Sequence, residues 1–112
     1  MDYNEKRALD LINRFNFNYT NIPKQRIINL LNEEYNNPHE GSSEYLRLLC
    51  GYLCCIGNKE DALLIKKIKY GLDMDTGCMI DSDFIIALEK EDKQLIENIK
   101  RQLKEYYQEY FK

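Results

Sequence analysis

The feature of this sequence that most constrains its fold is an apolar segment in the middle of the chain, "YLRLLCGYLCCIG". Between Tyr45 and Ile56 the apolar side chains fall on nearly every side of a helical axis, and not on a single stripe. A helix that is apolar all round is covered by neighbours on several faces. We therefore expect this segment to be the central helix of a domain. Gly51 within it costs about 1 kcal/mol relative to alanine, which predicts the close approach of a neighbouring helix.

Helical periodicity extends over most of the remaining chain. An apolar stripe starts at Ala8 and fades near "NFNYTN", and a second helix follows Pro23, whose fixed φ suits an opening helical turn. Further helices follow Asn58 and Asp81, and a last one runs into the aromatic tail "YYQEYF". We expect an all-α protein with a single helical domain over residues 1–112. Its five or six antiparallel helices would form either a helical bundle or a short HEAT-like α-solenoid.

Polar segments separate these helices and carry residues that start or end them. Gly57 fits the position after a helix C-terminus, and Asn58 with Asp61 is close to a capping box. Asp81 or Ser82 can cap the helix that follows. The stretch before that cap, "DMDTGCMID", is expected to be a polar turn with room for a short extended piece.

Composition narrows the class of partner. The chain has 112 residues, of which 44% are apolar, and its 16 basic against 19 acidic residues leave a net charge of -3. A dedicated nucleic-acid binder usually has a basic surplus or a clustered basic face, so we expect no nucleic-acid partner. No apolar run approaches the ~18 residues needed to span a bilayer, and the first residues carry no signal-like apolar region. We expect a cytoplasmic protein with no membrane partner.

The sequence offers little for catalysis. His39 is the single histidine and sits beside Pro38 in what reads as an exposed turn. The glycines are scattered and form no phosphate-binding loop. The three lysines Lys66, Lys67 and Lys69 suit the C-terminal half of a helix, where the dipole favours cations. We interpret these lysines as the solvated end of a helix in preference to a phosphate-binding patch. We expect no enzyme and no catalytic residue.

Metal and cofactor sites are not expected either. A calcium loop of the EF-hand type needs a glycine at position 6 and a glutamate at position 12. If such a loop began at Asp73 of "DMDTGCMIDSD", Gly77 would stand at position 5 and Phe84 at position 12, so the sequence does not fit. The cysteines lack the paired C-x2-C spacing of a zinc site. Cys50, Cys54 and Cys55 lie in the apolar segment, so reduced, buried thiols are expected.

The segment from Glu44 to Asp81 resembles a known class of protein. It combines a Leu/Cys/Tyr-rich helix, the turn "IGNKED", a second helix "ALLIKKIKY" and a loop that ends "GCMID". This pattern, over about a third of the chain, resembles small all-helical bacterial immunity proteins encoded beside polymorphic toxins, including some from contact-dependent growth inhibition systems. The resemblance implies an antitoxin that binds a cognate secreted toxin, often a nuclease, one-to-one and neutralises it by covering or distorting its active site.

A nuclease presents a basic, phosphate-binding surface, so its inhibitor should offer carboxylates around aromatic anchors. Tyrosine is abundant, with nine in the chain, and suits interfaces because it combines a rigid apolar body with a hydroxyl tip. The aromatic side chains of the tail "YYQEYF" either belong to such an interface or cover the end of the core. The partner-binding candidates are Asp73, Asp75, Asp81, Asp83, Glu33, Glu34, Tyr35, Tyr70, Tyr106, Tyr107 and Tyr110. The alternative function is a HEAT-like adaptor or regulatory module without a toxin partner.

Overall fold

The computed structural model describes residues 1–112 and contains seven α-helices, two short 3-10 helices and no strand. In chain order these are α1 (Tyr3–Phe15), the 3-10 helix η1 (Tyr19–Asn21), α2 (Lys24–Asn36), α3 (Glu44–Ile56), the 3-10 helix η2 (Lys59–Asp61), α4 (Ala62–Gly71), α5 (Met74–Met79), α6 (Ser82–Glu89) and α7 (Lys93–Tyr110). The all-α prediction is confirmed. None of these helices has both the length and the apolar character that crossing a membrane requires.

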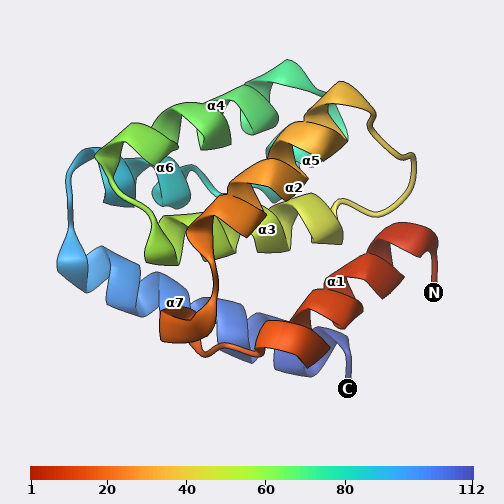
Figure 1. Ribbon diagram of the computed structural model, residues 1–112, viewed down its shortest axis with the longest axis horizontal. Helices are drawn as coiled ribbons and strands as arrows, with labels where there is room; N and C mark the ends of the chain where they lie inside the picture. Colours follow the sequence, from red (N-terminus) through yellow and green to blue (C-terminus); the bar gives the residue numbers. More distant parts are fainter.

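Helix α3 lies at the centre, and every other α-helix packs against it (Figure 1). All of its residues from Glu44 to Cys54 are buried except Arg47. This confirms the prediction of a central helix from its all-round apolar pattern. In a solenoid each repeat contacts only its neighbours along the chain. Because six helices surround one, the fold is a helical bundle and not a HEAT-like solenoid.

Gly51 marks the contact between α3 and α7. A Cβ atom at this position would lie 2.7 Å and 2.8 Å from the two methyl carbons of Leu103 on α7. Leu103 is itself buried. The predicted close approach of a neighbouring helix at Gly51 is therefore confirmed, and α7 is the helix that approaches.

Side-chain caps start several of the helices, as the sequence indicated. The Asp81 carboxylate accepts a hydrogen bond from the backbone N–H of Asp83 and caps α6. Asn58 and Asp61 form a capping box around η2, and Gly57 follows the last residue of α3. Pro23 stands one position earlier than expected, at the N-cap of α2.

The segment 73–81 differs from the expected polar turn. It contains an additional short helix, α5, which raises the total to seven α-helices in place of the expected five or six. The Asp73 carboxylate accepts hydrogen bonds from the backbone N–H and the hydroxyl of Thr76 and so starts α5. The Lys69 ammonium donates to the carbonyls of Gly77 and Ile80 at its end. Gly77 lies so close to α4 that a Cβ would be 2.7 Å from the carbonyl oxygen of Lys69.

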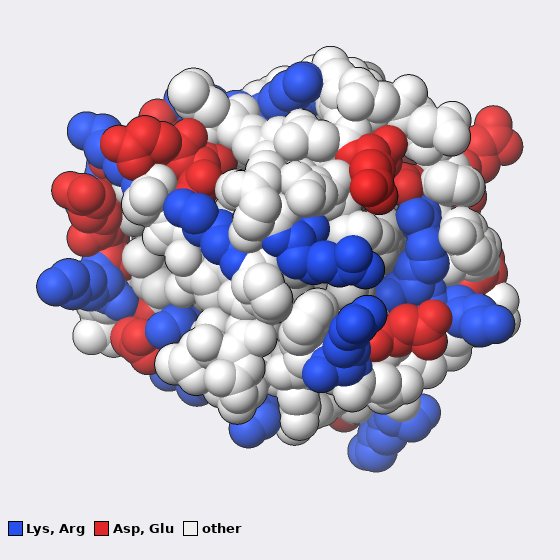
Figure 2. Space-filling view, viewed as in Figure 1, with Lys and Arg blue, Asp and Glu red and all other residues white.

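Charge is unevenly distributed over the surface. Figure 2 shows basic side chains gathered across the middle of the face on which α1 and α2 lie in Figure 1, with acidic side chains mostly around them. The chain therefore has a local basic surface despite its overall net charge of -3.

Candidate partner-binding site

Three adjoining hollows run over the surface from the α4–α5 connection, past the start of α6, to the end of α7. The first and second share Lys69 and Cys78, and the second and third share Tyr106. Because of these shared residues the three hollows adjoin one another, and we call them together the acidic groove. Its remaining lining residues are Arg47, Tyr70, Leu72, Asp73, Met74, Gly77, Met79, Ile80, Asp81, Ser82, Gln102, Glu105, Glu109 and Tyr110.

Large apolar side chains are exposed along the acidic groove. Met74 is 84% exposed and Tyr70 is 71% exposed, and Met79 and Tyr110 are also open to solvent. Tyrosine provides a rigid apolar surface with a polar tip, and methionine adapts its shape to a partner. Clustered exposed apolar side chains with a polar rim are typical of interaction sites.

Carboxylates surround these apolar side chains. Asp73 and Asp81 line the groove, and Asp75 and Asp83 are exposed beside them in the sequence. The hydrogen bond from the backbone N–H of Thr76 lowers the pKa of Asp73 below its ordinary value, which keeps this carboxylate charged at neutral pH. Two of the four predicted partner-binding aspartates, Asp73 and Asp81, therefore line the acidic groove, and the other two are exposed close to them in the sequence.

The two cations in the groove are already engaged within the protein. The Lys69 ammonium is held by the carbonyls of Gly77 and Ile80. The Arg47 guanidinium lies over the ring of Tyr106, 3.9 Å from its centroid. Asp73, Asp81, Glu105 and Glu109 also line the groove, so its four carboxylates outnumber its two cations and its net charge is negative.

The tail tyrosines divide between groove and core. Tyr110 is exposed, and its hydroxyl donates to a Glu5 carboxylate oxygen at 2.6 Å, which raises the pKa of Tyr110 to about 12. Tyr106 is half-buried, and its hydroxyl donates to Oε1 of Glu44 at 2.9 Å. Tyr107 is only 1% exposed, and its hydroxyl donates to the backbone carbonyl of Glu44. Tyr107 therefore seals the core, and its prediction as a partner-binding residue is wrong.

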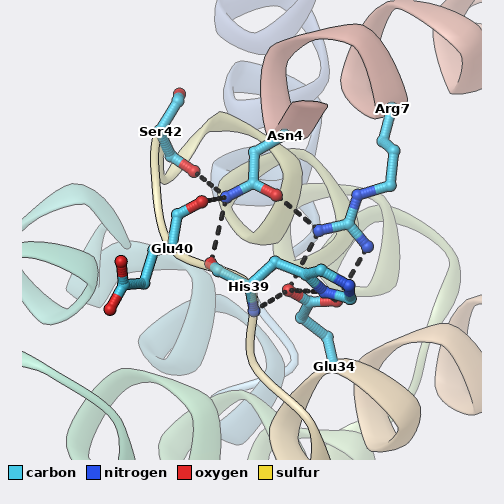
Figure 3. Close-up of polar contacts among 6 residues, drawn as sticks. All are labelled: Asn4, Arg7, Glu34, His39, Glu40 and Ser42. Atoms are coloured by element: carbon cyan, nitrogen blue, oxygen red, sulfur yellow. Dashed lines mark hydrogen bonds and ion pairs between the residues drawn. The ribbon is translucent and has the colours of Figure 1, made fainter. Parts of the chain in front are cut away.

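Glu34 was also predicted to face a partner, and this is wrong because it is buried and paired (Figure 3). It is 4% exposed, and its two oxygens accept hydrogen bonds from Arg7 at 2.8 Å and 3.0 Å. The backbone N–H of His39 donates to it as well, at 3.0 Å. Burial by itself would raise the pKa of Glu34, but these hydrogen bonds outweigh it and the pKa is lowered.

The two other candidates on α2 lie outside the acidic groove. Glu33 is exposed on α2 and lines none of the three hollows. Tyr35 is half-buried, with the Lys67 ammonium 4.3 Å from its ring centroid. Of the predicted partner-binding residues, Tyr70, Tyr106, Tyr110, Asp73 and Asp81 therefore line the acidic groove, but Asp75, Asp83, Glu33 and Tyr35 do not.

The lysines of α4 do not form a common patch. Lys66 pairs with Glu89 at 2.8 Å, Lys67 lies over the Tyr35 ring, and Lys69 holds the end of α5. Each lysine contacts a different element. The expected solvated helix end does not describe Lys69, whose ammonium donates hydrogen bonds to the carbonyls at the end of α5. A sequence pattern that predicts a turn at residues 73–81 does not indicate these hydrogen bonds.

The last feature of the site concerns side chains that could bind a metal ion. No three His, Cys, Asp or Glu side chains are clustered where they could hold a metal ion. All four cysteines are free thiols. Cys50 and Cys54 are fully buried in α3, and burial raises the pKa of Cys50 far above its ordinary value.

The structure is therefore an all-α bundle with an acidic surface groove that is lined by tyrosine and methionine side chains. No family model matches the chain, and neither a curated protein nor a solved structure matches it. Function is therefore inferred from the charge and the side chains of the acidic groove.

Proposed function

We propose that this protein is an immunity protein that binds a cognate protein toxin of the nuclease class one-to-one in the cytoplasm and neutralises it. One observation carries the proposal: the acidic groove presents exposed Met74, Tyr70 and Tyr110 in a lining whose carboxylates outnumber its cations. The resemblance of the segment from Glu44 to Asp81 to immunity proteins supports the same function.

Charge complementarity explains how such a complex would form. A nuclease binds phosphates with clustered Lys and Arg side chains. Opposite charge on Asp73, Asp75, Asp81 and Asp83 steers the encounter and disfavours partners of the wrong sign. The same contact places the inhibitor over the phosphate-binding surface, so the nucleic acid is excluded from it.

The apolar side chains supply the remaining affinity. Interfaces draw most of their binding energy from a few aromatic or apolar anchors that are enclosed by a polar rim. Tyr70 and Met74 are placed at one end of the acidic groove and Tyr110 at the other. A toxin surface with apolar positions between its basic residues would bury both ends at once.

Growth rescue tests this function. The protein is co-expressed with a toxin domain encoded beside it, and the number of surviving cells is counted. In the groove variant, Asp73→Asn and Asp81→Asn remove charge but keep a cap acceptor, and Asp75→Lys and Asp83→Lys reverse charge. We expect the unaltered protein to rescue growth and the groove variant to fail.

A matched control separates the groove from net charge. The control variant Glu60→Lys, Glu91→Lys, Glu97→Lys changes the total charge by the same amount at exposed positions that line none of the three hollows. It should rescue growth as the unaltered protein does. Rescue by the groove variant, or no rescue by the unaltered protein, would contradict the proposal.

A further inference from the structure

A second groove, of opposite charge, lies between α1 and α2. Both helices pack on α3, and between them a hollow is lined by residues of all three helices. It lies on the face whose middle is rich in basic side chains (Figure 2). We call it the basic groove. It is lined by Arg7, Asp10, Leu11, Arg14, Arg26, Leu30 and Tyr45.

The arginines of the basic groove differ in what they contact. Arg7 is paired with Glu34 and lies 3.9 Å from the centroid of the Tyr45 ring, so it belongs to the framework. Arg14 and Arg26 are exposed and form no ion pair or hydrogen bond. The Arg14 guanidinium lies 5.8 Å from the centroid of the Phe15 ring. Two guanidinium groups, from two different helices, are therefore free at one hollow.

The floor of the basic groove is apolar. Leu11 and Leu30 come from the two flanking helices, and Tyr45 comes from α3. Leu30 is half-buried, whereas Leu11 and Tyr45 show only their edges to solvent, at 8% and 6% exposure. Asp10 supplies the one carboxylate in the lining. A small inorganic anion would use the guanidinium groups but leave this floor uncovered. A ligand with both an apolar side chain and carboxylates uses both.

We propose that the basic groove is a docking site for an acidic amphipathic segment of a partner protein. An apolar side chain of the segment packs on Leu30 and on the exposed edges of Leu11 and Tyr45. Carboxylates on either side of it form bidentate hydrogen bonds with Arg14 and Arg26, a geometry that the planar guanidinium group favours. The site goes beyond toxin binding, because its charge is opposite to that of the acidic groove.

Fluorescence polarisation with short labelled peptides tests this site. The probe has two central leucines flanked by aspartates and glutamates, and a second probe has serines in place of the leucines. We expect the leucine probe to bind about tenfold more tightly than the serine probe. The variant Arg14→Gln, Arg26→Gln should weaken leucine-probe binding by about tenfold or more, because it removes both bidentate contacts.

Controls make each outcome decisive. Lys90→Gln, Lys93→Gln removes the same charge at exposed positions outside the basic groove and should leave probe binding unchanged. The groove variant of the toxin-binding surface should also bind the probe normally, so this proposal and the proposed function can fail separately. Equal binding of the two probes would show an oxyanion site only and overturn the proposal. Undiminished binding by Arg14→Gln, Arg26→Gln, with unchanged unfolding in urea, would overturn it as well.

Discussion

Glu34 joins parts of the chain that are far apart in sequence. Its carboxylate accepts hydrogen bonds from Arg7 on α1 and from the backbone of His39 in the loop after α2. The Asn4 side chain of α1 donates to the carbonyls of that loop at His39, Glu40 and Ser42 (Figure 3). One buried carboxylate and one amide thus hold the loop against the first helix.

Removing the charge of Glu34 should destabilise the protein. We expect Glu34→Gln to lower the free energy of unfolding by about 2 kcal/mol at pH 7, because the half-buried Arg7 loses its charged hydrogen-bond partner. The pKa of Glu34 is lowered in the folded state, so its stabilisation is present above the ordinary value of 4.5 and is lost as the pH falls through the folded pKa. Urea unfolding at pH 7 and pH 3 should show the difference between the two proteins shrinking in acid. An equal difference at both pH values would contradict this role.

Gly51 should resist replacement even by alanine. Alanine is the better helix former by about 1 kcal/mol, but its methyl group would overlap the buried methyl groups of Leu103. Overpacking of a core costs about 1–3 kcal/mol. We expect Gly51→Ala to destabilise the protein in urea unfolding. In a Leu103→Ala background the same change should become neutral or stabilising, and a cost that persists there would contradict the contact.

Residue roles were predictable from the sequence where their cause is local. The caps at Asp81 and Asn58 depend on backbone groups within three residues, so spacing alone identifies them. Glu34 and Tyr107 depend on partners 27 and 63 positions away, Arg7 and Glu44. No sequence pattern shows these pairings, and both residues were wrongly placed at the partner surface.

At the scale of elements, α5 is the helix that the sequence did not indicate. It has six residues, and isolated helices of this length are unstable in water. Gly77 near its end and the lack of an apolar stripe favour a turn. The helix forms because Asp73 caps its start and Lys69, from α4, holds the carbonyls at its end. The longer helices were predictable because their apolar faces repeat over several turns.

Loss of the Lys69 ammonium should loosen α5 alone. We expect Lys69→Met to speed amide hydrogen exchange in α5 by about tenfold, which corresponds to the ~1.4 kcal/mol that hydrogen bonds from a charged group contribute. Exchange in α3 should stay unchanged. Lys66→Met, which breaks the exposed pair with Glu89, serves as the matched control and should leave α5 unaffected. Unchanged exchange in α5 of Lys69→Met would contradict the proposed restraint.

At the scale of the whole molecule, one helix and the two chain ends tie the fold together. Every other α-helix packs on α3, and Tyr110 near the C-terminus donates a hydrogen bond to Glu5 near the N-terminus. We expect a single cooperative unfolding transition, with far-ultraviolet circular dichroism and tyrosine fluorescence giving the same midpoint in urea. Two separated transitions would contradict a core organised around α3.

The whole molecule also carries two grooves of opposite charge on different sets of helices. The acidic groove is formed by α4, α5, α6 and the end of α7, and the basic groove by α1 and α2 over α3. The sequence indicated the acidic residues and tyrosines, because they cluster along the chain. It did not indicate the basic groove, since Arg14 and Arg26 meet only when two separate helices pack on α3.

Titration calorimetry of the protein with the toxin domain encoded beside it tests the central claim most directly. We expect one-to-one binding by the unaltered protein and by the control variant Glu60→Lys, Glu91→Lys, Glu97→Lys. The groove variant Asp73→Asn, Asp75→Lys, Asp81→Asn, Asp83→Lys should bind about a hundredfold more weakly, because its rim no longer complements a basic surface. Equal affinity of the groove variant and the unaltered protein would contradict toxin binding at the acidic groove.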